Sequence, residues 1–159
     1  METLATASLD GTALDAWRSY LQSHASILRE LDAELAAEHG MTTRDYEVLL
    51  YLAQAPERRL PMSALAASTM LTRSGITRLV DGLVTQGYVD RAACPTDARV
   101  SFAELTEPGY QKLREAGCSH IASVRRLFVE HFSPEEIEQL SSLLSRLPGA
   151  QHGGSCSVE

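Results

Sequence analysis

Residues 72–87 read TRSGITRLVDGLVTQG. Thr72 is a typical residue to cap the start of a helix and Gly87 a typical residue just beyond its end, so this stretch predicts one helix. The apolar side chains recur at the spacing of a face that packs on a core, namely Ile76, Leu79, Val80 and Leu83. The opposite face is polar and carries Arg73, Ser74, Thr77, Arg78 and Asp81. One side of the helix is therefore expected in the core and the other at the surface.

Several short elements are expected around this helix. The pattern predicts a capped helix over 42–55, a basic extended piece at 58–60, an alanine-rich helix at 62–68 and two strands at 88–92 and 100–105. Only a brief connector separates the alanine-rich helix from the helix that follows Thr72. Two short helices joined by a tight turn and followed by a β-hairpin form a winged helix-turn-helix. We therefore predict such a lobe over residues 42–105.

Longer helices are expected at both ends of the chain. From about Ala13 to His39, apolar residues recur at alternating steps of three and four, as in a helix that packs against another helix. They are Leu14, Trp17, Leu21, Leu28, Leu31 and Leu35, with His24 in the same seam. A second long helix is expected from Thr106 to about His131, and a last one begins with the capping sequence Ser133-Pro134-Glu135-Glu136.

The predicted fold is therefore mainly α with a small β-hairpin wing. It comprises a winged helix-turn-helix lobe plus long N- and C-terminal dimerisation helices. Residues 11–40 and 106–147 are assigned to the dimerisation helices, because one small lobe cannot cover their apolar faces. The two chain ends, 1–10 and 148–159, are predicted to be flexible.

Charge is unevenly distributed along the chain. The formal net charge of −7 by itself argues against a nucleic-acid partner. Residues 56–99, however, hold six arginines and four acidic residues, whereas both flanks are acidic. Basic side chains are thus concentrated in the predicted lobe.

A lobe of this kind suits double-stranded DNA. An α-helix fits the major groove, arginine binds O6 and N7 of guanine together, and hydroxyl groups reach phosphates or base edges. The start of a helix also favours a phosphate. The DNA contacts predicted from this helix are Thr72, Arg73, Ser74, Thr77 and Arg78.

Five stretches carry a more specific pattern: Leu65-Ala66, Ser74 to Leu83, Gly87 to Arg91, Pro95 to Arg99, and Leu105 to Gly109. Their order and spacing resemble the MarR family of bacterial regulators, over about residues 13–147. The resemblance implies a homodimeric, ligand-responsive transcription regulator, a repressor, that binds a pseudo-palindromic operator. The helix would lie in the major groove and the hairpin wing in the minor groove. It adds Asp97 and Arg99 to the DNA contacts, with Asp97 orienting an arginine that enters the minor groove.

Three positions depart from the family pattern. Cys94 and Ala98 stand where the family usually has an acidic residue and a second arginine, and Gly82 stands where a basic residue is common. A glycine inside a helix also costs about 1 kcal/mol relative to alanine. The missing polar contacts predict a weaker or more salt-sensitive DNA complex.

The resemblance further implies a small organic ligand, often an aromatic acid, between the dimerisation helices and the lobe. Aromatic rings and a cation suit a planar carboxylate. The chain offers Trp17, Tyr20, His24, Arg44 and Tyr46 for this purpose. The alternative interpretation is that these residues pack in a core or a subunit interface.

Other classes of protein have less support in the sequence. It holds no CxxC, HExxH, GxGxxG, P-loop or GxSxG motif, so we expect no enzyme, no cofactor and no metal. No run approaches ~18 apolar residues, and Met1 to Asp10 do not resemble a signal peptide, so a cytoplasmic protein is expected. Two alternatives stay open: a winged-helix module that binds proteins rather than DNA, and a redox-sensing regulator that uses Cys94.

Overall fold

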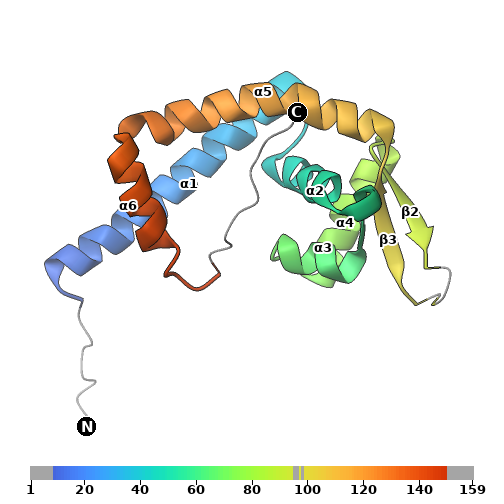
Figure 1. Cartoon of the computed structure of the whole chain (residues 1–159), viewed down its shortest axis with the longest axis horizontal. Helices are drawn as coiled ribbons and strands as arrows, with labels where there is room; N and C mark the ends of the chain where they lie inside the picture. Colours follow the sequence, from blue (N-terminus) through green and yellow to red (C-terminus); the bar gives the residue numbers. More distant parts are fainter. Residues whose placement is uncertain (1–8, 95–96, 98, 150–159) are drawn as a thin grey trace, which may run out of the picture.

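The computed structural model describes residues 9–94, 97 and 99–149. It is mainly helical with one small sheet, as the sequence predicts (Figure 1). In chain order the helices are α1 (Gly11–His39), α2 (Thr43–Gln54), α3 (Met62–Ser68), α4 (Arg73–Thr85), α5 (Glu107–Leu127) and α6 (Pro134–Leu144). The strands are β1 (Arg59–Pro61), β2 (Val89–Ala93) and β3 (Ser101–Leu105), and two short 3₁₀ helices lie at Pro56–Arg58 and Val129–His131.

Side chains at the helix starts explain why these segments are helical. Thr42 and Ser133 each form a reciprocal capping box, with Asp45 and Glu136 respectively. The hydroxyl of Thr72 accepts a hydrogen bond from the backbone N–H of Gly75, and Thr106 caps α5 in the same way. Each of these starts was predicted from the sequence, because a cap is a local signal.

The predicted hairpin is part of a three-stranded antiparallel sheet with the order β1-β3-β2. Val89 of β2 pairs with Leu105, and Arg59 of β1 pairs with Glu104 on the other side of β3. The basic extended piece expected at 58–60 is therefore a short edge strand. The sheet closes one side of the lobe.

The hydrophobic core lies inside the lobe and continues under the first half of α5. Its largest fully buried side chains are Leu49, Leu52, Leu65, Ile76, Leu83 and Leu113. Ile76, Val80 and Leu83, three of the four residues predicted for the core face of α4, are fully buried or nearly so, while Leu79 is partly buried. The polar face of α4 is consequently held outward.

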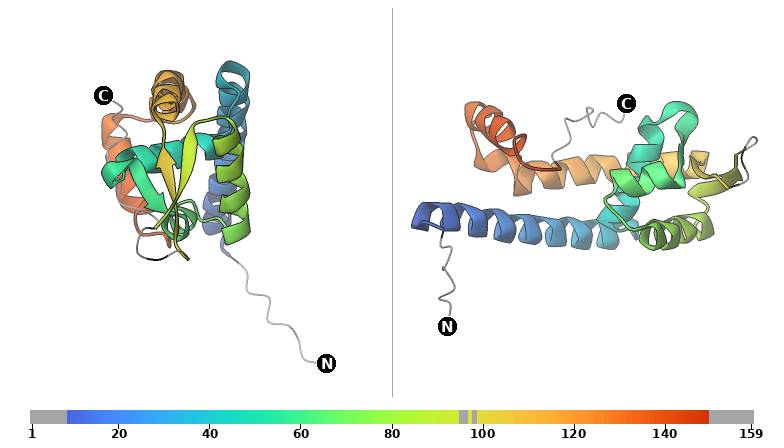
Figure 2. Two further views of the ribbon diagram at one scale, coloured as in Figure 1. Left: turned by 90° about the vertical axis from the view of Figure 1, so that its right-hand side faces the viewer. Right: turned by 90° about the horizontal axis from the view of Figure 1, so that it is seen from below.

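The long helices extend beyond the lobe. α1 and α5 lie side by side and antiparallel, and α6 turns back from the end of α5 (Figures 1 and 2). Leu31 and Leu35 of α1 are buried here, and Glu34 binds both Ser123 and Arg126 of α5. The earlier seam residues Trp17, Leu21 and Leu28 stay exposed.

The ends of the elements differ slightly from the predictions. α1 begins at Gly11, two residues earlier than its apolar pattern indicates, because Asp10 accepts a hydrogen bond from the N–H of Ala13. α5 ends at Leu127, before the 3₁₀ turn, rather than near His131. Most of the two chain ends predicted to be flexible, 1–8 and 150–159, lies outside the described residues, as does part of the wing tip. None of the described helices is long and apolar enough to cross a membrane.

Candidate nucleic-acid interface

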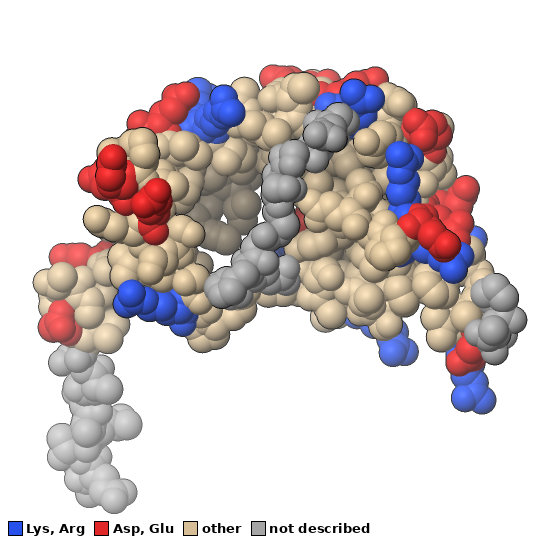
Figure 3. All heavy atoms as spheres, in the orientation of Figure 1, with Lys and Arg blue, Asp and Glu red and all other residues tan. Residues whose placement is uncertain are grey.

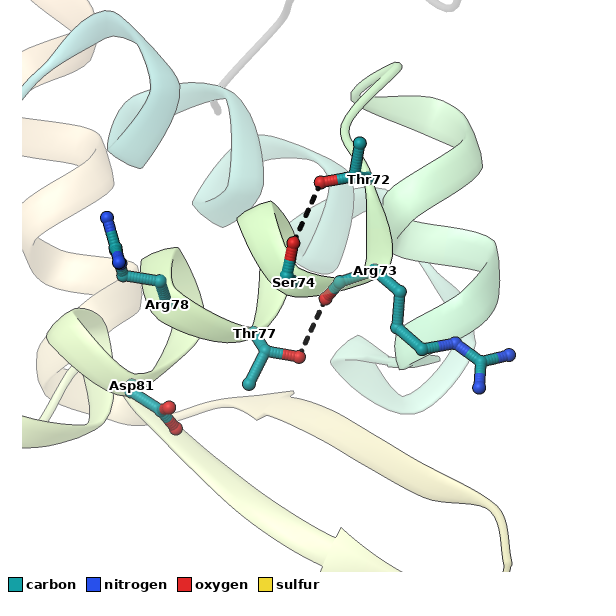
Figure 4. A pocket seen from close by; sticks show the side chains of 6 residues that line it. All are labelled: Thr72, Arg73, Ser74, Thr77, Arg78 and Asp81. Carbon is teal, nitrogen blue, oxygen red and sulfur yellow. Dashed lines mark hydrogen bonds between the residues drawn. The ribbon is translucent and has the colours of Figure 1, made fainter.

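The polar face of α4 forms an open surface, lined by Thr72, Arg73, Ser74, Thr77, Arg78 and Asp81 (Figure 4). The five DNA contacts predicted for this helix are all exposed there. Arg73 and Arg78 extend in opposite directions from the helix. In the described part of the chain, neither arginine takes part in an ion pair. Both guanidinium groups are therefore available to an external anion or base edge.

The hydroxyl groups on this face have more limited roles. Thr77 Oγ1 donates to the carbonyl of Arg73 at 2.8 Å, so its remaining capacity is to accept a hydrogen bond. Such a group suits a base amino group rather than a phosphate. Thr72 Oγ1 caps α4 and also lies 3.2 Å from Ser74 Oγ. One of these two hydroxyl groups donates to the other, so one hydroxyl proton remains for a hydrogen bond to a group outside the protein.

Arg91 of β2 joins the wing to α4. Its Nε donates to Asp81 Oδ1 at 3.1 Å, its Nη2 lies 2.9 Å from the same oxygen, and Nη2 also reaches the carbonyl of Thr77 at 3.3 Å. Asp81 is thus neutralised next to the face that would meet phosphates. The sequence places Arg91 and Asp81 in the family pattern but does not reveal this contact, because it joins two different elements.

The described part of the wing shows how its turn is shaped. Asp97 Oδ1 accepts a hydrogen bond from the backbone N–H of Arg99 at 3.0 Å, and the N–H of Val100 donates to the carbonyl of Asp97. Asp97 therefore orders the backbone at Arg99, and both side chains are exposed. Pro95, Thr96 and Ala98 lie outside the described residues.

The residues predicted to bind a ligand fall into two groups. Trp17, Tyr20 and His24 form a row on α1, with ring centroids 6.2 and 6.1 Å apart between neighbours. Arg44 and Tyr46 lie in the first turn of α2, whereas residues 17–24 belong to the free half of α1 (Figure 1). Within one chain, the structure does not gather the five residues around one cavity.

Tyr46 of α2 packs against His120 of α5, a contact between two elements that the sequence does not indicate. The ring of His120 lies 4.4 Å from that of Tyr46, and its Nδ1 is buried and has no hydrogen-bond partner among the described residues. Burial lowers the pKa of His120 below its usual value. The imidazole is therefore held neutral at the junction of α1, α2 and α5.

Groups for other chemistry are sparse among residues 9–94, 97 and 99–149. No three His, Cys, Asp or Glu side chains in this part cluster as a metal site. Cys94 is partly buried and Cys118 is exposed, and these two described cysteines form no disulfide with each other. The exposed arginines of α4 thus remain the most distinctive polar feature.

Charge on the surface agrees with this assignment. Basic side chains project from the lower edge of the lobe in Figure 3, below the helices and the hairpin. The fold and this face define a winged helix-turn-helix DNA-binding protein.

Comparisons with known proteins identify the family. Residues 39–100 match the model of the MarR family. MhqR, an HTH-type transcriptional regulator of Bacillus subtilis, is 30% identical over 69% of this chain and 74% of its own length. YetL, a transcriptional repressor of the same organism, is 30% identical over 70% of this chain and 68% of its own.

Solved structures agree with the sequence matches. AbsC of Streptomyces coelicolor superposes with a TM-score of 0.83 and 34% identity, over 87% of this chain and 93% of AbsC. Sco3205 of the same organism, solved in complex with DNA, gives 0.84 and 33% identity, over 89% of each chain. The chain belongs to the MarR family of transcriptional regulators.

Proposed function

We propose that this protein is a homodimeric repressor that binds a pseudo-palindromic operator, with α4 in the major groove and the β2–β3 wing in the minor groove. The observation that carries the proposal is the pair of arginines Arg73 and Arg78 on the exposed face of a capped helix, neither of which forms an ion pair with another described residue. Support also comes from Sco3205, whose structure contains DNA, and from YetL, which is named a repressor.

The proposed dimer rests on apolar surface that one chain leaves uncovered. Trp17, Leu21 and Leu28 of α1 are exposed, as are Leu143 and Leu147 at the other end of the chain. A second copy would cover these side chains and place two α4 helices about a two-fold axis. Two such helices reach successive major grooves when the half-sites lie about one helical turn apart.

The proposed ligand is a small organic acid, bound near the junction of the dimerisation helices and the lobe. In a dimer, the aromatic row Trp17, Tyr20 and His24 would face a partner, and Arg44 and Tyr46 would stand at the base of the lobe. A ligand lowers the affinity for DNA only if it binds more tightly to the dimer arrangement that does not bind DNA. A tenfold loss of DNA affinity requires a difference in ligand binding free energy of about 1.4 kcal/mol between the two arrangements. A screen of aromatic acids by Trp17 fluorescence, followed by His24→Ala and Arg44→Ala, tests this part.

DNA binding is tested with the duplex that the wild-type protein selects from its own promoter region. Arg73→Ala should weaken the free energy of operator binding by ~1–3 kcal/mol and relax the base preference, because a contact with guanine is lost. Arg99→Ala should weaken binding with little change in major-groove preference. Arg114→Ala, which removes an equal charge from α5, serves as the control.

Two results would count against the proposal. Retention of wild-type affinity by both Arg73→Ala and Arg99→Ala at ~0.15 M salt would rule out the docking arrangement. A wild-type affinity that does not fall with added salt would exclude phosphate contacts and favour the protein-binding alternative.

A further inference from the structure

The turn between α3 and α4 is tight and contains no glycine. Thr69 ends α3 and is fully buried, and its hydroxyl donates to the carbonyl of Leu65 at 2.8 Å. Met70 follows with a φ of 53°, in the left-handed region that non-glycine residues avoid because it costs free energy. The Met70 side chain is 77% exposed, so its own packing offsets little of this cost.

Two backbone hydrogen bonds close this turn, from the N–H of Met70 to the carbonyl of Ala67 and from the N–H of Leu71 to the carbonyl of Ala66, and one side chain from another element adds a third contact. Arg44 Nη1 donates to the carbonyl of Thr69 at 3.2 Å, across to the end of α3. The last carbonyls of a helix lack partners within it, and a cation there also meets the negative end of the helix dipole. Arg44 thus binds the Thr69 carbonyl, which accepts neither of the two backbone bonds that close the turn.

Arg44 is in turn fixed in place by α2. Its Nη1 lies 2.9 Å from Glu47 Oε2, one turn further along the same helix. α2 itself is anchored in the core by Val48, Leu49 and Leu52, which are fully buried. The guanidinium therefore ties the turn to a rigid part of the lobe.

We propose that Arg44 is a positioning residue for DNA reading, which fixes the turn at Thr69–Met70 and so the angle at which α4 enters the groove. Arg73 lies four residues after Thr69, so a change in the turn moves it directly. Base contacts need a geometry held to within about 0.5 Å, whereas phosphate contacts tolerate more freedom. The inference rests on the proposed DNA-binding function and gives Arg44 a role separate from ligand binding.

The test compares Arg44→Ala with the wild type on two duplexes, by fluorescence anisotropy over a range of salt. One duplex is the operator selected by the wild-type protein and the other has the same bases scrambled. Loss of the Arg44–Thr69 bond should weaken operator binding about tenfold, the equivalent of one charged hydrogen bond at its lower limit. Affinity for the scrambled duplex and the slope of affinity against salt should not change. Arg114→Ala is the control for loss of charge.

A second substitution separates positioning from general destabilisation. Met70→Gly makes the left-handed turn favourable without Arg44, so the double variant Arg44→Ala, Met70→Gly should regain most of the operator affinity. A role in global stability alone would instead change the melting temperature and leave the preference between duplexes intact. Arg44→Lys, which keeps the charge and one donor, should fall between the wild type and Arg44→Ala.

Three results would overturn the inference. The first is equal weakening on both duplexes with a salt slope lower by about one, because Arg44 would then contact a phosphate. The second is a folded double variant that regains no operator affinity. The third is a folded Arg44→Ala that keeps its full preference for the operator. If the wild type itself showed no preference between the duplexes, the proposed function would fail, and this inference with it.

Discussion

At the scale of single residues, Gly109 is the position with the least room. A Cβ built there would lie 2.1 Å from the carbonyl oxygen of Tyr88, which is backbone and cannot swing away. We expect Gly109→Ala to lower the free energy of unfolding by about 1–3 kcal/mol or more, since α5 must shift away from the sheet. Urea unfolding measures the change. Gly11→Ala, where a Cβ meets no atom of the described residues within 4 Å, is the control, and an unchanged midpoint for Gly109→Ala would contradict the close contact of Gly109 with Tyr88.

His120 should make stability depend on pH. Burial lowers its pKa in the folded protein below the ordinary value of about 6.5, so the unfolded chain binds the proton more readily. The stability that the neutral imidazole contributes is therefore complete above a pH of about 6.5, and it is lost as the pH falls from there towards the lowered pKa of the folded protein. Glu34 and Glu38 are the acidic residues that lie around His120 on α1, and the carboxylate of Glu34 is bound by Ser123 and Arg126.

The measurement is urea unfolding of the wild type and of His120→Phe, which keeps a ring against Tyr46 but has no proton to bind. Between pH 7.5 and 5.5, the free energy of unfolding should fall more for the wild type than for the variant. Equal pH dependence of the two proteins would show that His120 does not contribute.

At the scale of elements, α4 contains two glycines in different surroundings. A Cβ at Gly82 meets no atom of the described part of the chain within 4 Å, whereas one at Gly75 lies 3.2 Å from Thr72 Oγ1, the capping atom. Gly82→Ala should stabilise the protein by about 1 kcal/mol, because alanine loses less entropy in a helix. Gly75→Ala should gain less or lose stability, because its methyl group crowds the cap. Thermal unfolding of the two variants compares these effects, and an equal gain from both would refute the distinction.

The elements also show what a sequence can predict. The helices that follow Thr42, Thr72 and Ser133 were predicted closely, since cap and apolar spacing lie within a few residues of each other. The strand at 59–61 was predicted only as an extended piece, because its partner lies about forty residues later in the chain. A strand of three residues has no alternation to reveal it.

In the candidate site, too, local features could be predicted from the sequence and contacts between elements could not. Exposure of the polar face of α4 follows from its helical period, so the predicted DNA contacts on this helix were found where expected. The contacts of Arg91 with Asp81 and of Arg44 with Thr69 each join two elements, and no local pattern indicates them. The five predicted ligand residues were separated into two groups for a related reason: the length of α1 carries its aromatic row away from the lobe.

At the scale of the whole molecule, the uncovered half of α1 leads to a prediction about assembly. Trp17 is 52% exposed and Leu21 44% exposed, although both belong to an apolar seam. The protein should sediment at about twice its chain mass of 17.3 kDa. Leu21→Glu should give a monomer that binds the operator weakly, because a buried charge opposes association. Ser19→Glu, on the opposite side of α1, should stay dimeric, and a wild-type monomer at micromolar concentration would contradict the proposed dimer.

The contacts of Arg91 with Asp81 and Thr77 have a consequence for the base sequence of the operator. They join α4 to the wing within each subunit, so in the proposed complex the two elements contact one continuous half-site of fixed length. A base pair inserted within a half-site should abolish specific binding, because the distance between α4 and the wing cannot increase to match it. In the proposed dimer, the spacing between the two half-sites depends on contacts between subunits and not on Arg91. Natural operators should therefore vary more in the spacing between half-sites than in the length of each half-site.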